Sequence, residues 1–187
     1  MTPNRLTIVL IGLMGTGKST VARTLATHYG LECLDTDKLV EARAGKSVRQ
    51  IFADDGEPTF RDIESDVLAD CLRSPNGAVI AGAGGVVVRD ANRELINDAR
   101  STSGVLVVWL HARPEVLAVR TTKGGHRPLL DEDREGTLVR LSDERAPMYS
   151  AVADIVVDVS DRSQESVCTL LIDAIDEAVK YGDGSNG

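Results

Sequence analysis

Residues 12–19 (GLMGTGKS) carry the clearest chemical signal in the chain. They follow the apolar run 6–11 and precede a segment of helical spacing at 20–26, so the pattern predicts a strand, a loop and a helix in succession. Glycines let successive backbone N–H groups point into one concavity, and the following helix directs its positive end to the same place. The spacing G-x-x-x-x-G-K-S therefore predicts a phosphate-binding loop (P-loop) for a nucleoside triphosphate.

Two side chains of this loop are expected to act directly on the phosphates. Lys18 would neutralise the β- and γ-phosphates, and the hydroxyl of Ser19 would ligate Mg²⁺. Loop amides would supply the remaining contacts. The predicted nucleotide-binding set is Gly15, Thr16, Gly17, Lys18, Ser19 and Thr20.

The segment Asp35-Thr36-Asp37 is the expected source of acidic groups near the phosphates. The ends of the core strands at 80–82 and 109–111 offer no carboxylate. Residues two apart in an extended segment point to the same side, so both carboxylates are predicted to face the phosphates. One would support the metal through water, and the other would accept a proton from an attacking hydroxyl. The alternative is that Asp35 or Thr36 caps the following helix, which leaves the second carboxylate unexplained.

Three further features have both a functional and an ordinary interpretation. Arg61 and Glu64 are three residues apart on one predicted helix, so the carboxylate can orient a guanidinium for a substrate carboxylate, although a simple surface pair has the same spacing. The glycine-rich loop 82–85 offers backbone N–H groups to a ligand, or forms a tight turn. Arg145 is by default a charge on a helix surface.

The polar segment 123–128, which contains Gly124 and Gly125 and ends in His126-Arg127-Pro128, has the composition of a mobile lid. Arg127 would then reach the transferring phosphate, whereas His126 is expected to be exposed. A mobile surface loop explains the same composition.

Composition limits the classes of function. The 187 residues fit one domain, and the net charge of −8 argues against general nucleic-acid binding. Cys33, Cys71 and Cys168 lack metal-binding spacing and indicate a reducing compartment. No apolar stretch reaches transmembrane length, so we expect a cytoplasmic protein without membrane contact, and the lack of a second domain favours a monomer.

Short apolar strands alternate with helices along the chain. This pattern predicts an α/β fold of three layers, α/β/α, around a five-stranded parallel sheet. Strands are expected at 6–11, 32–35, 78–81, 105–110 and 155–158. Helices are expected at 18–29, 36–44, 47–52, 58–72, 90–100, 114–121, 134–151 (with a break near Pro147) and 164–181, before a disordered tail at 182–187.

Taken in order, these residues resemble the shikimate kinases, which are small P-loop enzymes similar to nucleoside-monophosphate kinases. The resemblance runs from about residue 6 to residue 160. It is carried by residues 12–19, Asp35-Thr36-Asp37, Ile51-Phe52, Gly56-Glu57, Phe60-Arg61 through Glu64, the loop 82–85, Arg127-Pro128-Leu129-Leu130 and Arg145-Ala146-Pro147-Met148-Tyr149.

The resemblance implies that ATP phosphorylates the 3-hydroxyl of shikimate, a step of chorismate and aromatic amino acid biosynthesis. It assigns substrate-binding helices to about 36–73 and a lid to about 112–130. The implied catalytic residues are Lys18, Arg127 and Asp37, with Asp37 as base and as ligand of the substrate hydroxyls. Ser19 and, through water, Asp35 would hold Mg²⁺, and Arg162 would cover the adenine. The implied substrate site comprises Asp37, Phe52, Phe60, Arg61, Glu64, Gly82, Ala83, Gly84 and Arg145, where both arginines grip the carboxylate and Glu64 holds Arg61.

The chain departs from the family pattern at two places. Ala83 stands where the family usually has the middle of three glycines, whose N–H meets the substrate. An alanine there is strained if its φ is positive and otherwise only narrows the pocket. The segment 158–163 lacks the usual Asn…Pro pattern, and the lid is one residue short.

Three other functions remain open at this stage. A related P-loop kinase acting on another small polyol acid, such as gluconate, would use the same paired arginines. A GTP-dependent switch is disfavoured because the chain has no Asn-Lys-x-Asp motif. A catalytically silent regulator that binds nucleotide would retain the P-loop, with Ala83 blocking the acceptor pocket.

Overall fold

Five short segments form the strands of one sheet in the computed structural model, which describes residues 6–122 and 133–183. The three central strands consist mainly of β-branched and aliphatic residues, which suits strands that are covered on both faces, whereas the edge strand at 32–35 is half acidic. The strands are β1 (Thr7–Ile11), β2 (Glu32–Asp35), β3 (Ala78–Ala81), β4 (Val105–His111) and β5 (Ile155–Asp158). Every residue of β1 and β3 is buried, so these two strands form the centre of the core.

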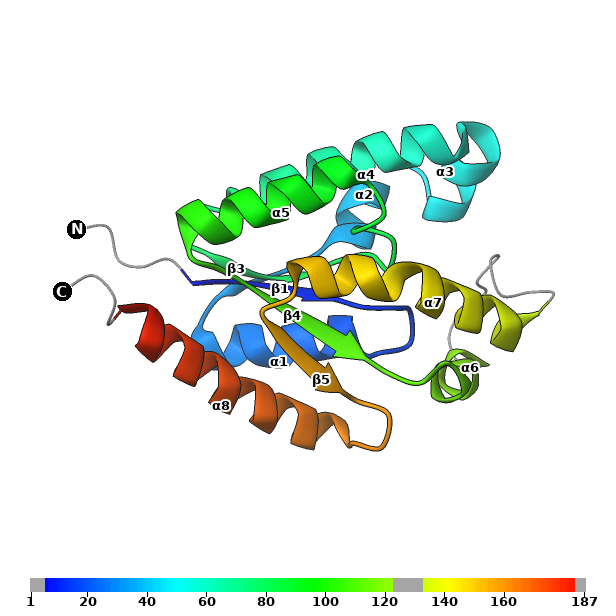
Figure 1. The fold of residues 1–187 in the computed structure, drawn as a ribbon. Coiled ribbons are helices and arrows are strands. Elements are labelled where there is room, and N and C mark those ends of the chain that lie inside the picture. The colour runs from blue at the N-terminus through cyan, green and yellow to red at the C-terminus, as the bar shows by residue number, and fades with distance from the viewer. Residues whose placement is uncertain (1–5, 123–132, 184–187) are drawn as a thin grey trace.

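The sheet is parallel throughout its described pairs, in the order β2-β3-β1-β4-β5. Helices α1 and α8 cover one face, and α5 and α7 cover the other (Figure 1). This confirms the predicted three-layer α/β/α architecture. The chain adds β2 and β3 on one side of β1 and then β4 and β5 on the other, so the strand order reverses beside β1. Ligands of such sheets bind at the carboxyl ends of the strands next to that point.

The helices begin and end close to the expected positions. Gly30, Gly45 and Gly104 each adopt the left-handed conformation at a helix C-terminus. Ser47 and Gln50 form the predicted capping box at the start of α3. The helices are α1 (Lys18–Tyr29), α2 (Thr36–Ala44), α3 (Val48–Asp54), α4 (Gly56–Leu72), α5 (Asp90–Ser103), α6 (Pro114–Thr122), α7 (Arg134–Val152) and α8 (Gln164–Asp183).

Two predictions about proline were wrong. We expected a helix to begin at Pro58, but α4 begins at Gly56. Pro58 is the third residue of α4, where a backbone N–H would have no partner within the helix, so a proline is tolerated there. We also expected a break near Pro147, but α7 continues through it. Pro147 has no N–H to donate to the carbonyl of Asp143, four residues earlier. Both residues are exposed, so water can donate to that carbonyl instead.

The helices α2, α3 and α4 pack against one another beside the β2–β3 side of the sheet (Figure 1). They span the region where the substrate-binding helices were expected. Of the predicted lid, α6 covers 114–122, whereas residues 123–130, including Arg127, lie outside the described residues. No helix of the described chain is both long and apolar enough to cross a membrane.

Candidate active site

The predicted P-loop joins β1 to α1. Its glycines occupy positions where the backbone conformation or a close neighbour leaves no room for a side chain. Gly12 has φ 137°, and a Cβ there would lie 2.3 Å from the backbone oxygen of Leu110. Gly17 caps α1 in a left-handed conformation, without a side-chain hydrogen bond to the helix, and the first turn carries no acidic residue. The positive end of α1 is therefore not offset by a carboxylate of its own first turn, which suits an anion.

The side chains of this loop are held by the loop itself. Lys18 Nζ donates to the backbone oxygens of Gly12 (2.7 Å) and Leu13 (2.9 Å). The buried Thr16 hydroxyl also donates to Leu13 O, at 2.9 Å. Ser19 is exposed in the first turn of α1, and Thr20 is half-buried beside it. The six residues predicted to bind nucleotide thus lie on one loop and one helical turn.

Sheet register brings two further loops next to the P-loop. Asp35, the last residue of β2, pairs in register with Ala81 of β3, which pairs with Leu10 of β1. Gly82 N then donates to Leu10 O at 2.9 Å. The segment 35–37, the loop 82–89 and the P-loop therefore leave the sheet side by side, at the carboxyl ends of three neighbouring strands.

Thr36 joins two of these loops, a role the sequence did not indicate. It is fully buried, and its Oγ1 accepts a hydrogen bond from Ala83 N (2.8 Å) and donates to Ala81 O (3.3 Å). Sequence reasoning considered Thr36 only as a helix cap. Its position between two carboxylates was visible, but its partners are about 45 residues away and come together only in the sheet.

Contrary to our prediction, Asp35 and Asp37 do not lie on one side of an extended segment. The strand ends at Asp35 and α2 begins at Thr36, so Asp37 belongs to the first helical turn. Asp35 makes no side-chain capping bond to α2, which removes the capping alternative for it. Both carboxylates still lie at the carboxyl end of β2. Asp37 is exposed, and its charge adds to burial, the main cause, in raising the pKa of Glu64.

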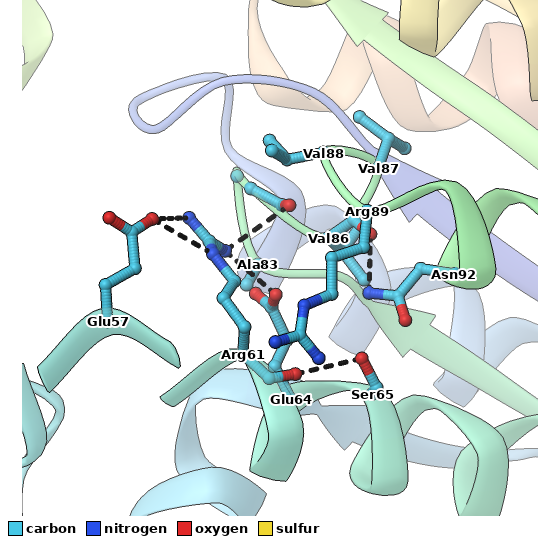
Figure 2. A network of polar contacts seen from close by, with 12 residues as sticks. Glu57, Arg61, Glu64, Ser65, Ala83, Val86, Val87, Val88, Arg89 and Asn92 are labelled. Atoms are coloured by element: carbon cyan, nitrogen blue, oxygen red, sulfur yellow. Dashed lines mark hydrogen bonds and ion pairs between the residues drawn. The ribbon is translucent and has the colours of Figure 1, made fainter. Parts of the chain in front are cut away.

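Arg61 is held over the loop that follows β3 (Figure 2). Its Nη1 donates to Glu64 (2.8 Å) and to Gly85 O (3.4 Å), and a Cβ at Gly85 would lie 2.5 Å from that nitrogen. Burial is the main cause that raises the pKa of Glu64, and the Arg61 guanidinium opposes it. The guanidinium carbon lies 5.2 Å from the centroid of the Phe60 ring, which packs against Phe52. The predicted Arg61–Glu64 pair is therefore a partly buried one, not a surface pair.

Arg145 approaches the same loop from α7. Its Nη1 donates to Gly84 O at 2.8 Å, and the Tyr149 hydroxyl donates to the same oxygen at 2.5 Å. Tyr149 is buried against Trp109, and burial raises its pKa to about 12. Arg145 is itself buried, which contradicts its default interpretation as a helix-surface charge. Tyr149 was quoted in the sequence pattern but was given no role.

The structure answers the question of Ala83. No residue other than glycine has a positive φ among the described residues, so the Ala83 methyl is not strained. Ala83 is buried, and its N–H is donated to Thr36. The expectation that this N–H meets a ligand does not fit the geometry. Gly82 lies behind it against β1, whereas a Cβ on Gly84 would lie 3.5 Å from the Met14 nitrogen of the P-loop.

Helix α5 secures the far end of the same loop. Asn92 Nδ2 donates to Val86 O at 2.8 Å, and Arg93 Nη1 donates to Val87 O at 2.6 Å. Figure 2 shows Asn92 beneath Val86. Nothing in the sequence pattern distinguished Asn92 or Arg93 from other polar residues on that helix.

Arg162 lies in the turn after β5, at the side where adenine was expected. It is exposed, and its Nε donates to Asp158 O at 3.1 Å. Two arginines that the sequence did not single out support this turn. Arg113 pairs with Asp161 (2.8 Å), and Arg120 donates to Val159 O (2.8 Å).

The residues present fit a magnesium ion that is shared with a nucleotide. Among residues 6–122 and 133–183, no group of three His, Cys, Asp or Glu side chains could hold a metal ion by itself. Mg²⁺ is usually bound through one or two carboxylates together with phosphate oxygens and water, so such a group is not needed. Asp35, whose side chain does not cap α2, and the exposed Ser19 hydroxyl supply suitable oxygen atoms.

Replacing Thr36 by valine should destabilise the protein. Valine has nearly the same shape, but it leaves the Ala83 N–H and the Ala81 carbonyl without their hydroxyl partner in a buried site. An unpaired buried polar group costs about 1–3 kcal/mol, so we expect a loss of that size in the free energy of unfolding measured with urea. Thr36→Ser keeps the hydroxyl and serves as the control. Equal stability of the two variants would contradict this role.

Comparisons with known proteins agree with this geometry. A sequence model described as shikimate kinase matches residues 14–176. The shikimate kinase of Halorhodospira halophila is 42% identical over 175 residues, which cover 93% of this chain and 94% of that protein. The structure of shikimate kinase from Acinetobacter baumannii in complex with shikimate has a TM-score of 0.84 and 32% identity, and covers 92% of this chain and 93% of that one.

A more distant match indicates the fold alone. A gluconokinase from Sinorhizobium meliloti has a TM-score of 0.60 and 18% identity, with 98% of this chain and 99% of that chain covered. The family model and the relatives above one-third identity carry the stronger conclusion: this chain belongs to the shikimate kinase family.

Proposed function

We propose that this chain transfers the γ-phosphoryl group of ATP to the 3-hydroxyl of shikimate, giving shikimate 3-phosphate and ADP for chorismate and aromatic amino acid biosynthesis. The observation that carries the proposal is the convergence of two arginines on one loop. Arg61 from α4 reaches Gly85 O, and Arg145 from α7 reaches Gly84 O. Gly84 in turn lies against the P-loop at Met14. A site for a carboxylate-bearing acceptor thus adjoins the site for phosphates.

The acceptor site is built to hold an anion with a ring. Arg61 and Arg145 bind the shikimate carboxylate, because guanidinium groups pair with two oxygens at once. Glu64 orients Arg61 from below, and the rings of Phe52 and Phe60 form an apolar wall. The Gly84 backbone lines the remaining side, whereas the N–H groups of Gly82 and Ala83 are bound to Leu10 O and Thr36 within the protein.

The donor site holds ATP through the P-loop. Amides of Gly15, Thr16, Gly17 and Thr20 contact the phosphates, and Lys18 leaves the carbonyls of Gly12 and Leu13 to bind the β- and γ-phosphates. Ser19 and, through water, Asp35 hold Mg²⁺. When bound, Mg²⁺ neutralises charge on the phosphate oxygens. Arg162 covers the adenine side of the nucleotide.

Asp37 is the proposed base. It takes the proton of the shikimate 3-hydroxyl as that oxygen forms a bond to the γ-phosphorus and the bond between the γ-phosphorus and the bridging oxygen of ADP breaks. Arg127, which lies outside the described residues, is proposed to stabilise the charge on the transferring group from the lid. A cytoplasmic location, a single domain and a monomeric state complete the proposal.

Gluconate phosphorylation and a silent regulatory role are less well supported. The gluconokinase match is a likeness of fold at 18% identity. A silent regulator was suggested by an Ala83 that blocks the acceptor pocket, but the Ala83 methyl is unstrained and its N–H faces Thr36.

The product of the reaction tests the proposal. Purified protein is incubated with ATP, Mg²⁺ and shikimate, and the phosphate is located by correlation of phosphorus and proton resonances in NMR spectra. Coupling of the new phosphorus signal to the proton on carbon 3 is the expected result. A phosphate on another hydroxyl would contradict the proposed orientation, and no new phosphate ester would contradict the proposed function.

A further inference from the structure

Most of the hydrogen-bonding capacity of Arg61 is used by the protein itself. A guanidinium has five N–H groups. Nε and Nη2 of Arg61 both donate to Oε1 of Glu57, at 3.3 and 3.1 Å. Nη1 donates to Glu64 at 2.8 Å and to Gly85 O at 3.4 Å. Figure 2 shows Glu57 and Glu64 next to the guanidinium, with Glu57 on the side away from Asn92. One N–H of Nη2 is left outside these contacts.

A carboxylate that binds arginine through both of its oxygens needs two parallel N–H groups on one edge of the guanidinium. The Nε–Nη2 edge is already bound to a carboxylate, that of Glu57. The Nη1–Nη2 edge offers a single N–H, because Nη1 is bound to Glu64 and Gly85. A substrate carboxylate can therefore form the paired contact only after one of these groups leaves.

Glu57 is the group most easily displaced. The Glu57 side chain is 62% exposed, and its closest oxygen lies 3.1 Å from Arg61 Nη2. The Glu64 side chain is 0% exposed, and its oxygen lies 2.8 Å from Arg61 Nη1. Gly85 contributes a backbone oxygen and cannot rotate away. Glu57 also lies in the first turn of α4, where the positive end of the helix favours a carboxylate that has turned into water.

We propose that Glu57 is a specificity-determining residue: its carboxylate occupies the Nε–Nη2 edge of Arg61 until the carboxylate of the acceptor displaces it. This inference rests on the proposed function, in which Arg61 binds the shikimate carboxylate. The exchange replaces one carboxylate by another on a side chain that is 12% exposed, so Arg61 is paired before and after binding. An acceptor without a carboxylate leaves Glu57 in place and gains nothing from Arg61.

The prediction is that removing this competitor strengthens shikimate binding. Glu57→Gln removes the charge, and Glu57→Asp keeps the charge but shortens the side chain by one methylene group. Because a partly exposed ion pair contributes little, we expect the KM for shikimate to fall about two- to fivefold in both variants. The change should appear in KM rather than kcat, because Glu57 competes with binding and not with phosphoryl transfer.

Asp62→Asn is the matched control. Asp62 is an exposed acidic residue of the same helix that pairs with Arg89 and not with Arg61, so its removal changes the local charge without releasing Arg61. We expect its KM to stay at the wild-type value. An unchanged or higher KM in Glu57→Gln, an unchanged KM in Glu57→Asp, or an equal fall in Asp62→Asn would overturn the inference. Wild-type protein that does not phosphorylate shikimate would instead overturn the proposed function.

Discussion

Replacing Asp37 by asparagine is expected to reduce kcat for shikimate phosphorylation by about 10²–10⁴-fold, the usual contribution of a positioned general base. Asp37 lies in the first turn of α2, next to Thr36, which holds the loop after β3. Burial is the main cause that raises the pKa of Glu64, the partner of Arg61, and the charge of Asp37 adds to it. We therefore propose Asp37 as the carboxylate that acts on the acceptor hydroxyl. Asparagine preserves the size of the side chain but cannot accept the hydroxyl proton.

Two measurements separate loss of the base from loss of the fold. The steady-state rate of ADP release gives kcat, and calorimetric titration gives the affinity for ATP, which should stay near the wild-type value because the P-loop is untouched. Asp35→Asn is the matched control: it removes a neighbouring carboxylate that we propose to act on the metal, so its defect should shrink as the Mg²⁺ concentration is raised. Near-normal turnover in Asp37→Asn would remove Asp37 as the base.

Replacing Lys18 by alanine is expected to reduce kcat by about 10²–10³-fold, the cost of removing one group that stabilises charge in the transition state. In the structure Lys18 Nζ is bound to two carbonyls of its own loop, at 2.7 and 2.9 Å. The ammonium is therefore already held over the P-loop, where the β- and γ-phosphates are expected. Alanine leaves the glycines and the helix end in place but removes the charge.

The affinity for ATP should fall along with kcat in Lys18→Ala, because the same ammonium contacts the bound phosphates before transfer. Lys180→Ala, which removes the same charge from the far end of α8, should behave like wild type. Turnover within about twofold of wild type in Lys18→Ala would contradict the proposed role, since effects of general base or oxyanion groups are far larger.

Much of the fold follows from local patterns. The central strands β1, β3 and β4 are short apolar runs, as expected of parallel strands that are covered on both faces. Helix ends at Gly30 and Gly45 follow from their left-handed conformation, and Ser47 with Gln50 is a local capping box. The P-loop was recognisable for the same reason, since its residues are consecutive.

The rest of the site depends on contacts between distant segments. Nothing within a few residues of Thr36 shows that its hydroxyl holds Ala83, and nothing near Arg145 shows that its guanidinium reaches Gly84. Only the family resemblance suggested a role for Arg145, and neither the resemblance nor the local pattern, which offered Thr36 as a helix cap, suggested that Thr36 holds the loop after β3. Pro147 was misjudged because the helix is maintained by buried side chains such as Tyr149, which outweigh one lost hydrogen bond.

The rate of ADP release with a panel of acceptors tests the central claim most directly. Purified protein with ATP and Mg²⁺ is assayed with shikimate, with quinate, with gluconate and without an acceptor. Strong stimulation by shikimate alone is the predicted result, since the account requires the P-loop to hold ATP while Asp37 and both arginines act on shikimate. Stimulation by gluconate but not by shikimate, or no stimulation by any acceptor while ATP still binds, would contradict the account.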